Sequence, residues 1–193
     1  MHPYSIDTNA RQTVYSLLAI IAFVIPGFVA SDRVTHLVGD KLSYPFGVGA
    51  TFGVLFLLFD HVFWKWLQFI LHIPNLNGTW TAKGISSYED PATGKPMEFV
   101  MEYKIKQTFT RIEISGETDK STSRSTMASL EIDHAVPIFR YAFENTPRNM
   151  SDAELQRHPG LIELRLNSVA KMTGDYFSGK HRLRYGELIF TKA

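Results

Sequence analysis

The densest group of side chains suited to binding lies near the C-terminus, in residues 176–185, which read YFSGKHRLRY. Basic side chains stand between its two aromatic ends, and no acidic residue occurs in it; they are Lys180, His181, Arg182 and Arg184. A guanidinium matches phosphate, and an aromatic ring offers a face for a base. The segment therefore suits a nucleotide phosphate better than a fatty acid. Two alternatives stay open, a solvated hairpin tip and a tip that contacts anionic lipid headgroups.

Signatures of catalysis are absent from the chain. The histidines after residue 130 have no metal-ligand spacing, and the absence of cysteine excludes thiolate zinc sites and disulfides. No GxSxG elbow surrounds the serines of residues 121–125, and neither a P-loop nor a Rossmann fingerprint occurs. We predict that the protein is not an enzyme, has no metal site and needs no cofactor.

Alternating polar and apolar residues after residue 75 predict the strands that would position the basic cluster. The expected strands are 79–88, 98–106, 108–116, 125–133, 138–145, 161–167, 171–178 and 186–192, and 149–158 is the one helix-like segment. About eight short antiparallel strands indicate an all-β domain, closed as a small lipocalin-like barrel, with a sandwich as the alternative. Trp80, in a GxW opening, is expected to plug the closed end of the barrel.

Several positions predicted to face inward carry large side chains with polar tips, namely Tyr103, Gln107, Tyr141, Asn145 and Tyr176. A purely structural core would prefer aliphatic side chains, and a barrel of eight strands can hold one small ligand. The pattern favours a small ligand cavity. The alternative is a wet barrel mouth without a ligand.

Two apolar stretches, residues 14–30 and 42–59, precede the strands. A helix that crosses ~30 Å of hydrocarbon needs roughly twenty apolar residues. We therefore predict a membrane α-helical hairpin with a juxtamembrane segment in residues 1–74, and a β-barrel domain in residues 75–193. Trp64, Lys65 and Trp66 would anchor it at the interface. A cleaved signal peptide is the alternative for the first stretch, but its N-terminal flank is weakly basic.

Gly49 and Gly53 form a GxxxG pattern in the second stretch. Glycines four residues apart share a helix face and allow another helix to approach closely, so we predict self-association in the bilayer. The alternative is that glycine is simply common in membrane helices. The formal charge of +1 gives no reason to expect binding to DNA or RNA.

The order of motifs resembles the CD-NTase-associated effectors of bacterial CBASS anti-phage defence, which join two transmembrane helices to a cyclic-nucleotide-sensing β-barrel. The motifs follow the two-span N-terminus in the order NGTW, KQTFTRIEI, STSRS, FRYAFENTP, RHPG, TGDYFSGKHR and GELIF. The resemblance covers the whole length of the chain. The order and spacing of the motifs carry it, since none is specific alone.

The resemblance implies that the barrel faces the cytoplasm at a bacterial inner membrane and binds a cyclic dinucleotide made by a cGAS-like nucleotidyltransferase. This activating ligand would promote homo-oligomeric assembly of the hairpins in the lipid bilayer, membrane disruption and death of the infected cell. The implied ligand-binding residues are Gln107, Thr108, Arg111, Ser121, Ser123, Ser125, Tyr141, Asn145, Tyr176, Lys180 and Arg182. Two alternatives remain, a membrane-tethered lipocalin-like carrier of an apolar molecule and a scaffold whose barrel binds another protein.

Overall fold

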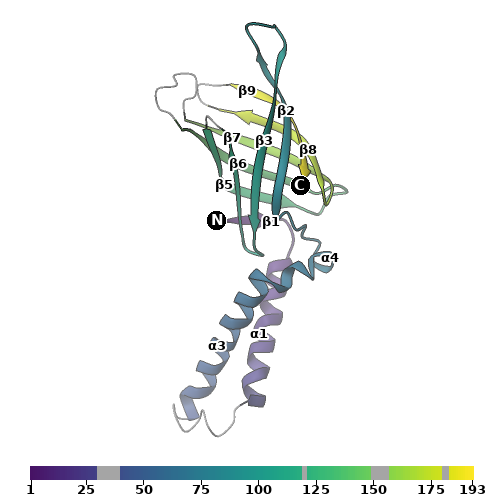
Figure 1. Cartoon of the computed structure of the whole chain (residues 1–193). Helices are drawn as coiled ribbons and strands as arrows, with labels where there is room; N and C mark the ends of the chain where they lie inside the picture. Colours follow the sequence, from purple (N-terminus) through teal and green to yellow (C-terminus); the bar gives the residue numbers. More distant parts are fainter. Residues whose placement is uncertain (30–39, 119–120, 149–156, 180–182) are drawn as a thin grey trace. The chain divides into compact units, whose positions relative to one another are not determined.

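The chain forms two compact units, one built of strands and one of helices (Figure 1). The computed structural model describes residues 1–29, 40–118, 121–148, 157–179 and 183–193. The strand unit comprises Met1–Asp7 and His72–Ala193, and the helical unit comprises Thr8–Leu71. The first seven residues therefore belong to the same unit as the C-terminal strands.

The helical unit is a hairpin of α1 (Ala10–Val29) and α3 (Asp40–His61), followed by the short helices η1 (Phe63–Lys65) and α4 (Gln68–Leu71). Val14, Leu18 and Ala22 of α1 are spaced four residues apart and are buried, as expected for one helix face. The two helices approach closely, because a Cβ atom on Gly47 would lie 3.5 Å from Cβ of Pro26. Apolar side chains on the remaining faces are exposed.

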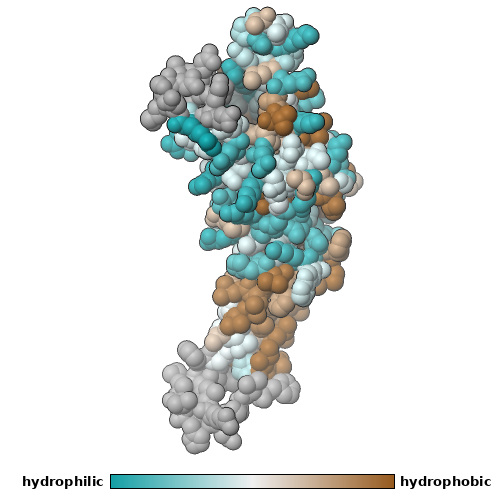
Figure 2. All heavy atoms as spheres, in the orientation of Figure 1, coloured by the Kyte–Doolittle hydropathy of each residue, from teal (hydrophilic) through white to brown (hydrophobic). Residues whose placement is uncertain are grey.

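Figure 2 shows brown apolar side chains along these helices. In α1, Leu17 is 54% exposed, and Ile20 and Phe23 are each 60% exposed. Among the residues that the structure describes, however, no helix combines the length and the apolarity that a membrane span requires. The two expected membrane spans are therefore not confirmed.

The strand unit is a closed barrel in which each strand from β2 to β8 pairs antiparallel with the next, and β9 pairs with β2. All eight expected strands are present within a few residues of their predicted bounds. They are β2 (Gly78–Glu89), β3 (Pro96–Gln107), β4 (Arg111–Glu117), β5 (Ser121–Glu131), β6 (Ile138–Pro147), β7 (His158–Ser168), β8 (Lys171–Ser178) and β9 (Arg184–Lys192). The expected helix-like segment 149–158 lies outside the described residues, except for Arg157 and for His158, which begins β7.

A ninth strand, β1 (His2–Ile6), was not predicted from the sequence. β4 and β5 pair directly only where residues 115–117 face residues 122–124, and β1 lies between them further along. It runs antiparallel to β4 and parallel to β5, so the barrel is mixed rather than wholly antiparallel. The segment HPYSI is too short to show an extended alternation, and Tyr4 is its only buried residue.

One end of the barrel is sealed by packed side chains. Trp80 is fully buried, and its indole Nε1 donates a 2.9 Å hydrogen bond to the carbonyl oxygen of Leu76. Gln107 accepts from the backbone N–H of Leu76 at 2.8 Å and donates to the Tyr4 hydroxyl and to the Pro74 carbonyl oxygen. The packing role predicted for Trp80 is confirmed.

Candidate ligand-binding cavity

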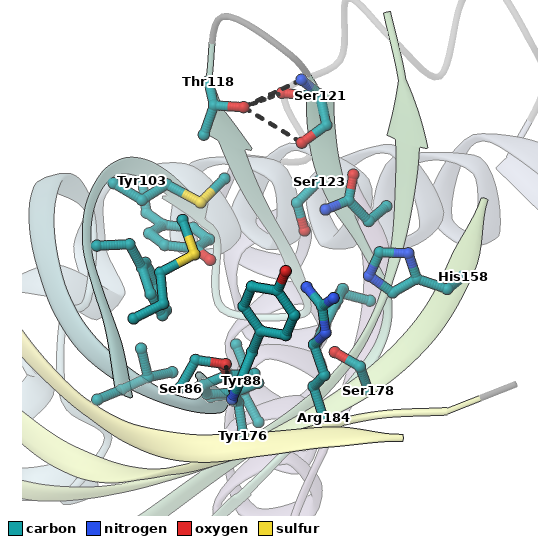
Figure 3. A pocket seen from close by; sticks show the side chains of 17 residues that line it. Ser86, Tyr88, Tyr103, Thr118, Ser121, Ser123, His158, Tyr176, Ser178 and Arg184 are labelled. Atoms are coloured by element: carbon teal, nitrogen blue, oxygen red, sulfur yellow. Dashed lines mark hydrogen bonds between the residues drawn. The ribbon is translucent and has the colours of Figure 1, made fainter. Parts of the chain in front are cut away.

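A cavity of about 510 Å³ lies inside the opposite end of the barrel (Figure 3). This volume falls within the ~300–1,000 Å³ of typical small-molecule sites. The described side chains that line it are Ser86, Tyr88, Met97, Phe99, Met101, Tyr103, Thr118, Ser121, Ser123, Phe143, Asn145, His158, Ile162, Tyr176, Ser178, Arg184 and Leu188. Two of them, His158 and Arg184, are basic, and none is Asp or Glu.

Five polar residues form a row around the cavity, which we call the polar collar: Ser123, Asn145, His158, Ser178 and Arg184. They are held in register by strand pairing, because Asn145 lies opposite both Ser123 and His158, and Ser178 lies opposite Arg184. The Oδ1 atom of Asn145 is buried and has no hydrogen-bond partner among the described residues. Buried polar atoms are normally satisfied, so this amide is suited to a bound ligand or water.

Arg184 is the cation of the collar with the clearest geometry. Its Cζ atom lies 3.9 Å from the centre of the Tyr88 ring, and Figure 3 shows the two side chains next to each other in the cavity. None of the ion pairs among the described residues involves Arg184. A guanidinium that stacks on a ring and lacks a carboxylate partner keeps its N–H fork free for an anion such as phosphate.

Four aromatic residues contribute a second set of cavity walls, which we call the aromatic layer: Phe99, Tyr103, Phe143 and Tyr176. The Phe99 and Tyr176 rings meet edge to face, with centroids 5.9 Å apart. Burial raises the pKa of Tyr103, and the neighbouring Tyr176 raises it further. This phenol therefore stays protonated and neutral, so the layer offers ring faces and a hydroxyl rather than charge.

Four of the predicted ligand-binding residues line the cavity, namely Ser121, Ser123, Asn145 and Tyr176. Tyr141 is almost fully buried but is not among the lining residues, and its hydroxyl has no partner in the described structure. Burial raises the pKa of Tyr141 well above its ordinary value, with a further contribution from Tyr103. The structure thus gathers part of the predicted set at one end of the barrel.

Four other predicted residues that the structure describes do not line this cavity, namely Gln107, Thr108, Arg111 and Ser125. Ser125 joins strands, because its Oγ accepts from the Ile114 N–H at 2.9 Å and lies 2.8 Å from Nε2 of His2. Gln107 belongs to the sealed end, where Thr108 Oγ1 accepts the N–H of Arg111 at 3.0 Å in the β3–β4 turn. Arg111 is exposed.

Two further predicted residues, Lys180 and Arg182, lie outside the described residues. Gly49 and Gly53 are in α3, and no heavy atom of the described residues would lie within 4 Å of a Cβ atom at either position. Sequence reasoning left Arg184 and His158 out of the predicted ligand set, although both line the cavity.

A closed barrel that is sealed at one end and holds at the other a cavity whose described lining includes two basic residues and no Asp or Glu belongs to the class of small-ligand-binding β-barrels. Residues 71–192 match the family model described as "Cap15, cyclic dinucleotide receptor domain", and the chain belongs to this family. A similar curated protein is CD-NTase-associated protein 15 from Yersinia aleksiciae, which is 30% identical over 148 residues. The alignment covers 75% of this chain and 68% of that protein. The resemblance inferred from the motifs is thereby confirmed at the level of the family.

Proposed function

We propose that this protein is a membrane effector of CBASS anti-phage defence whose barrel binds a cyclic dinucleotide in the cavity beside the polar collar. The observation that supports this most directly is the guanidinium of Arg184, which forms no ion pair among the described residues and lies in a cavity whose described lining has no carboxylate. Phosphodiesters need cations or N–H and O–H donors, and bases need aromatic faces. The polar collar offers the cations and donors, and the aromatic layer offers the ring faces.

The proposal assigns the helical unit to the bilayer. Exposed apolar side chains such as Leu17, Ile20 and Phe23 are unfavourable in water at ~25 cal/mol per Å² of apolar surface, and patches of this kind mark interaction surfaces. Binding shifts assembly of the hairpins only through a higher affinity for the assembled state. A switch from 1:99 to 99:1 needs about 5.5 kcal/mol of such preference. Assembly would then disrupt the inner membrane and kill the infected cell.

The cavity also bears on the two alternative functions. A carrier of apolar molecules fits the apolar part of the lining, such as Met97 and Leu188, but it would give no role to the polar collar with Arg184 at the border of the cavity. A scaffold that binds only through its outer surface would need no interior space, and a cavity of about 510 Å³ is present. Both observations favour a polar, aromatic ligand.

Thermal unfolding of the full chain in lipid nanodiscs tests the proposal against a panel of cyclic dinucleotides of adenosine, guanosine, uridine and cytidine, in matched and mixed pairs. At about a hundredfold excess over Kd, one member should stabilise the folded state by ~2.7 kcal/mol, which corresponds to a rise of a few degrees in Tm. Linear dinucleotides and a fatty acid are the controls. The absence of any shift across the panel, with lipid recovered from the purified barrel, would instead support the carrier.

A second readout is growth of cells that express the full chain together with an active or an inactive cGAS-like nucleotidyltransferase. Toxicity is expected only with the active enzyme, because only then is the ligand made. Equal toxicity with both enzymes would contradict control by a ligand.

A further inference from the structure

Each ring of the aromatic layer lies directly opposite a glycine on a neighbouring strand. The four cross-strand pairs are Phe99 with Gly84, Tyr103 with Gly116, Phe143 with Gly160, and Tyr176 with Gly186. They occur at four different strand pairings around the barrel. In each of the four pairs, the ring can occupy its position because the residue opposite it has no side chain.

The rings occupy the space that a Cβ atom would need at these glycines. A Cβ on Gly84 would lie 2.4 Å from Cζ of Phe99, and one on Gly160 would lie 2.2 Å from Cζ of Phe143. For the other two pairs the distance to the tyrosine Cε1 would be 2.7 Å. Carbon atoms in contact are separated by ~3.5–4.0 Å, so a Cβ at Gly84 or Gly116 would displace the ring opposite it. At Gly160 and Gly186 a Cβ would also meet a backbone oxygen, at 2.7 and 2.0 Å. The cavity that the four rings line offers room for a displaced ring.

We propose that these glycines act as recesses that hold the four rings against the wall, so that the cavity stays open as a slot for one nucleobase of the bound cyclic dinucleotide. The phosphates stay at the polar collar beside Arg184. This inference rests on the proposed function, because that function supplies the ligand class. Transfer of a charged phosphate into an apolar environment is costly unless it is paired, whereas a neutral planar base gains from stacking.

The polar atoms next to the layer agree with a base rather than with an aliphatic guest. The Oδ1 atom of Asn145, which lines the cavity, is buried and has no partner among the described residues. An unsatisfied buried group costs ~1–3 kcal/mol, which an apolar guest would leave in place. An N–H group on the edge of a base can donate a hydrogen bond to this oxygen.

Gly84 is the most informative position for a test, because the three nearest atoms that a Cβ would meet there all belong to the side chains of Phe99 and Leu188. Gly84→Ala should therefore be accommodated by moving the Phe99 ring toward the cavity. In the full chain in nanodiscs, we expect Gly84→Ala to weaken binding of the tightest panel ligand by at least about tenfold, as for the loss of one stacked base.

The matched control is Gly179→Ala, at the same end of the barrel, where the nearest atoms would be 3.7 and 3.8 Å from the new Cβ. Its affinity should stay within about twofold of wild type, well below the tenfold that corresponds to ~1.4 kcal/mol. Wild-type affinity in Gly84→Ala would overturn the inference while leaving the proposed function intact.

Saturation-transfer NMR on the wild-type chain gives a second measurement that does not depend on how well a variant folds. Protons of one base should receive more saturation from the protein than the ribose protons of the same ligand. Equal or greater saturation of the ribose would overturn the inference. A wild-type chain that binds no member of the panel would overturn the proposed function and this inference together.

Discussion

At the scale of single residues, Arg184 is expected to contribute most to the affinity for phosphate. Its guanidinium is held by the Tyr88 ring at 3.9 Å and forms no ion pair among the described residues. Hydrogen bonds to charged groups contribute ~1.5–3 kcal/mol, so Arg184→Gln should weaken binding of the tightest panel ligand by about ten- to hundredfold. Arg184→Lys keeps the charge but loses the planar fork and the stacking, so its affinity should fall between those of wild type and Arg184→Gln.

Isothermal titration at two salt concentrations measures this effect, since loss of a phosphate contact should also reduce the salt dependence. The control is Arg165→Gln, which removes the same charge from an exposed position on β7. Equal affinity of Arg184→Gln and wild type would place the phosphates elsewhere.

The sequence analysis singled out the segment that contains this cation, residues 176–185, but did not include Arg184 in the predicted ligand set. Arg184 lies an even number of residues before Leu188 and Phe190, so its side chain faces the barrel interior as theirs do. This inference is possible only once β9 is known to begin at residue 184. Alternation gives the face of a strand, not the end of the barrel at which a side chain lies. Gln107 was therefore correctly predicted to face inward, yet it belongs to the sealed end.

At the scale of elements, β1 shows what a periodic pattern cannot predict. The strand is only five residues long, and it is held by contacts made to distant parts of the chain. Asp7 accepts hydrogen bonds from the N–H groups of Ile132 at 2.9 Å and Asp133 at 3.1 Å, and the terminal amine of Met1 lies 3.0 Å from Glu113. A fragment that begins at residue 75 omits this strand and leaves part of β4 and β5 without their partner.

Asp7→Ala tests the attachment of β1. Loss of the charge-assisted hydrogen bonds should lower the free energy of unfolding by about 1–2 kcal/mol at neutral pH. Burial pushes the pKa of Asp7 upward, but the N–H groups of Ile132 and Asp133 lower it more, so the pKa lies below its ordinary value in the folded state. The contribution of Asp7 to stability is thus fully present above the unfolded pKa of ~3.9 and is lost as the pH falls through the lower, folded pKa.

Urea unfolding of wild type and Asp7→Ala at several pH values measures this contribution. The difference should be constant from about pH 7 to pH 5 and should shrink below the ordinary Asp pKa of ~3.9. Asp175→Ala, on an exposed position of β8, is the control and should change little. A difference that does not depend on pH would mean that the carboxylate charge has no part in holding β1.

At the scale of the whole molecule, the sequence patterns that correctly predicted strands and helices were local. Eight strands follow from alternation within each segment, and α1 and α3 follow from uninterrupted apolar runs. The cavity could not be predicted in this way, because it depends on which aromatic residue meets which glycine across two strands, as Phe143 meets Gly160. The family follows from the order of motifs along the chain, and that order is global information.

The proposed assembly of the hairpins leads to a prediction that separates it from ligand binding. A Cβ atom at Gly49 or Gly53 would have no heavy atom of the described residues within 4 Å, so larger side chains there fit within a single chain. If these glycines allow helices of neighbouring chains to approach, Gly49→Leu together with Gly53→Leu should weaken assembly by at least about tenfold, which corresponds to ~1.4 kcal/mol.

Cross-linking in nanodiscs with ligand, and toxicity in cells, measure this loss. Ligand affinity should be unchanged because the cavity lies in the barrel. Val54→Leu is the control, because Val54 is also exposed but points about 100° away from Gly53 and about 140° away from Gly49 around the helix. A double variant that still assembles and kills like wild type would exclude this helix face as the contact between chains.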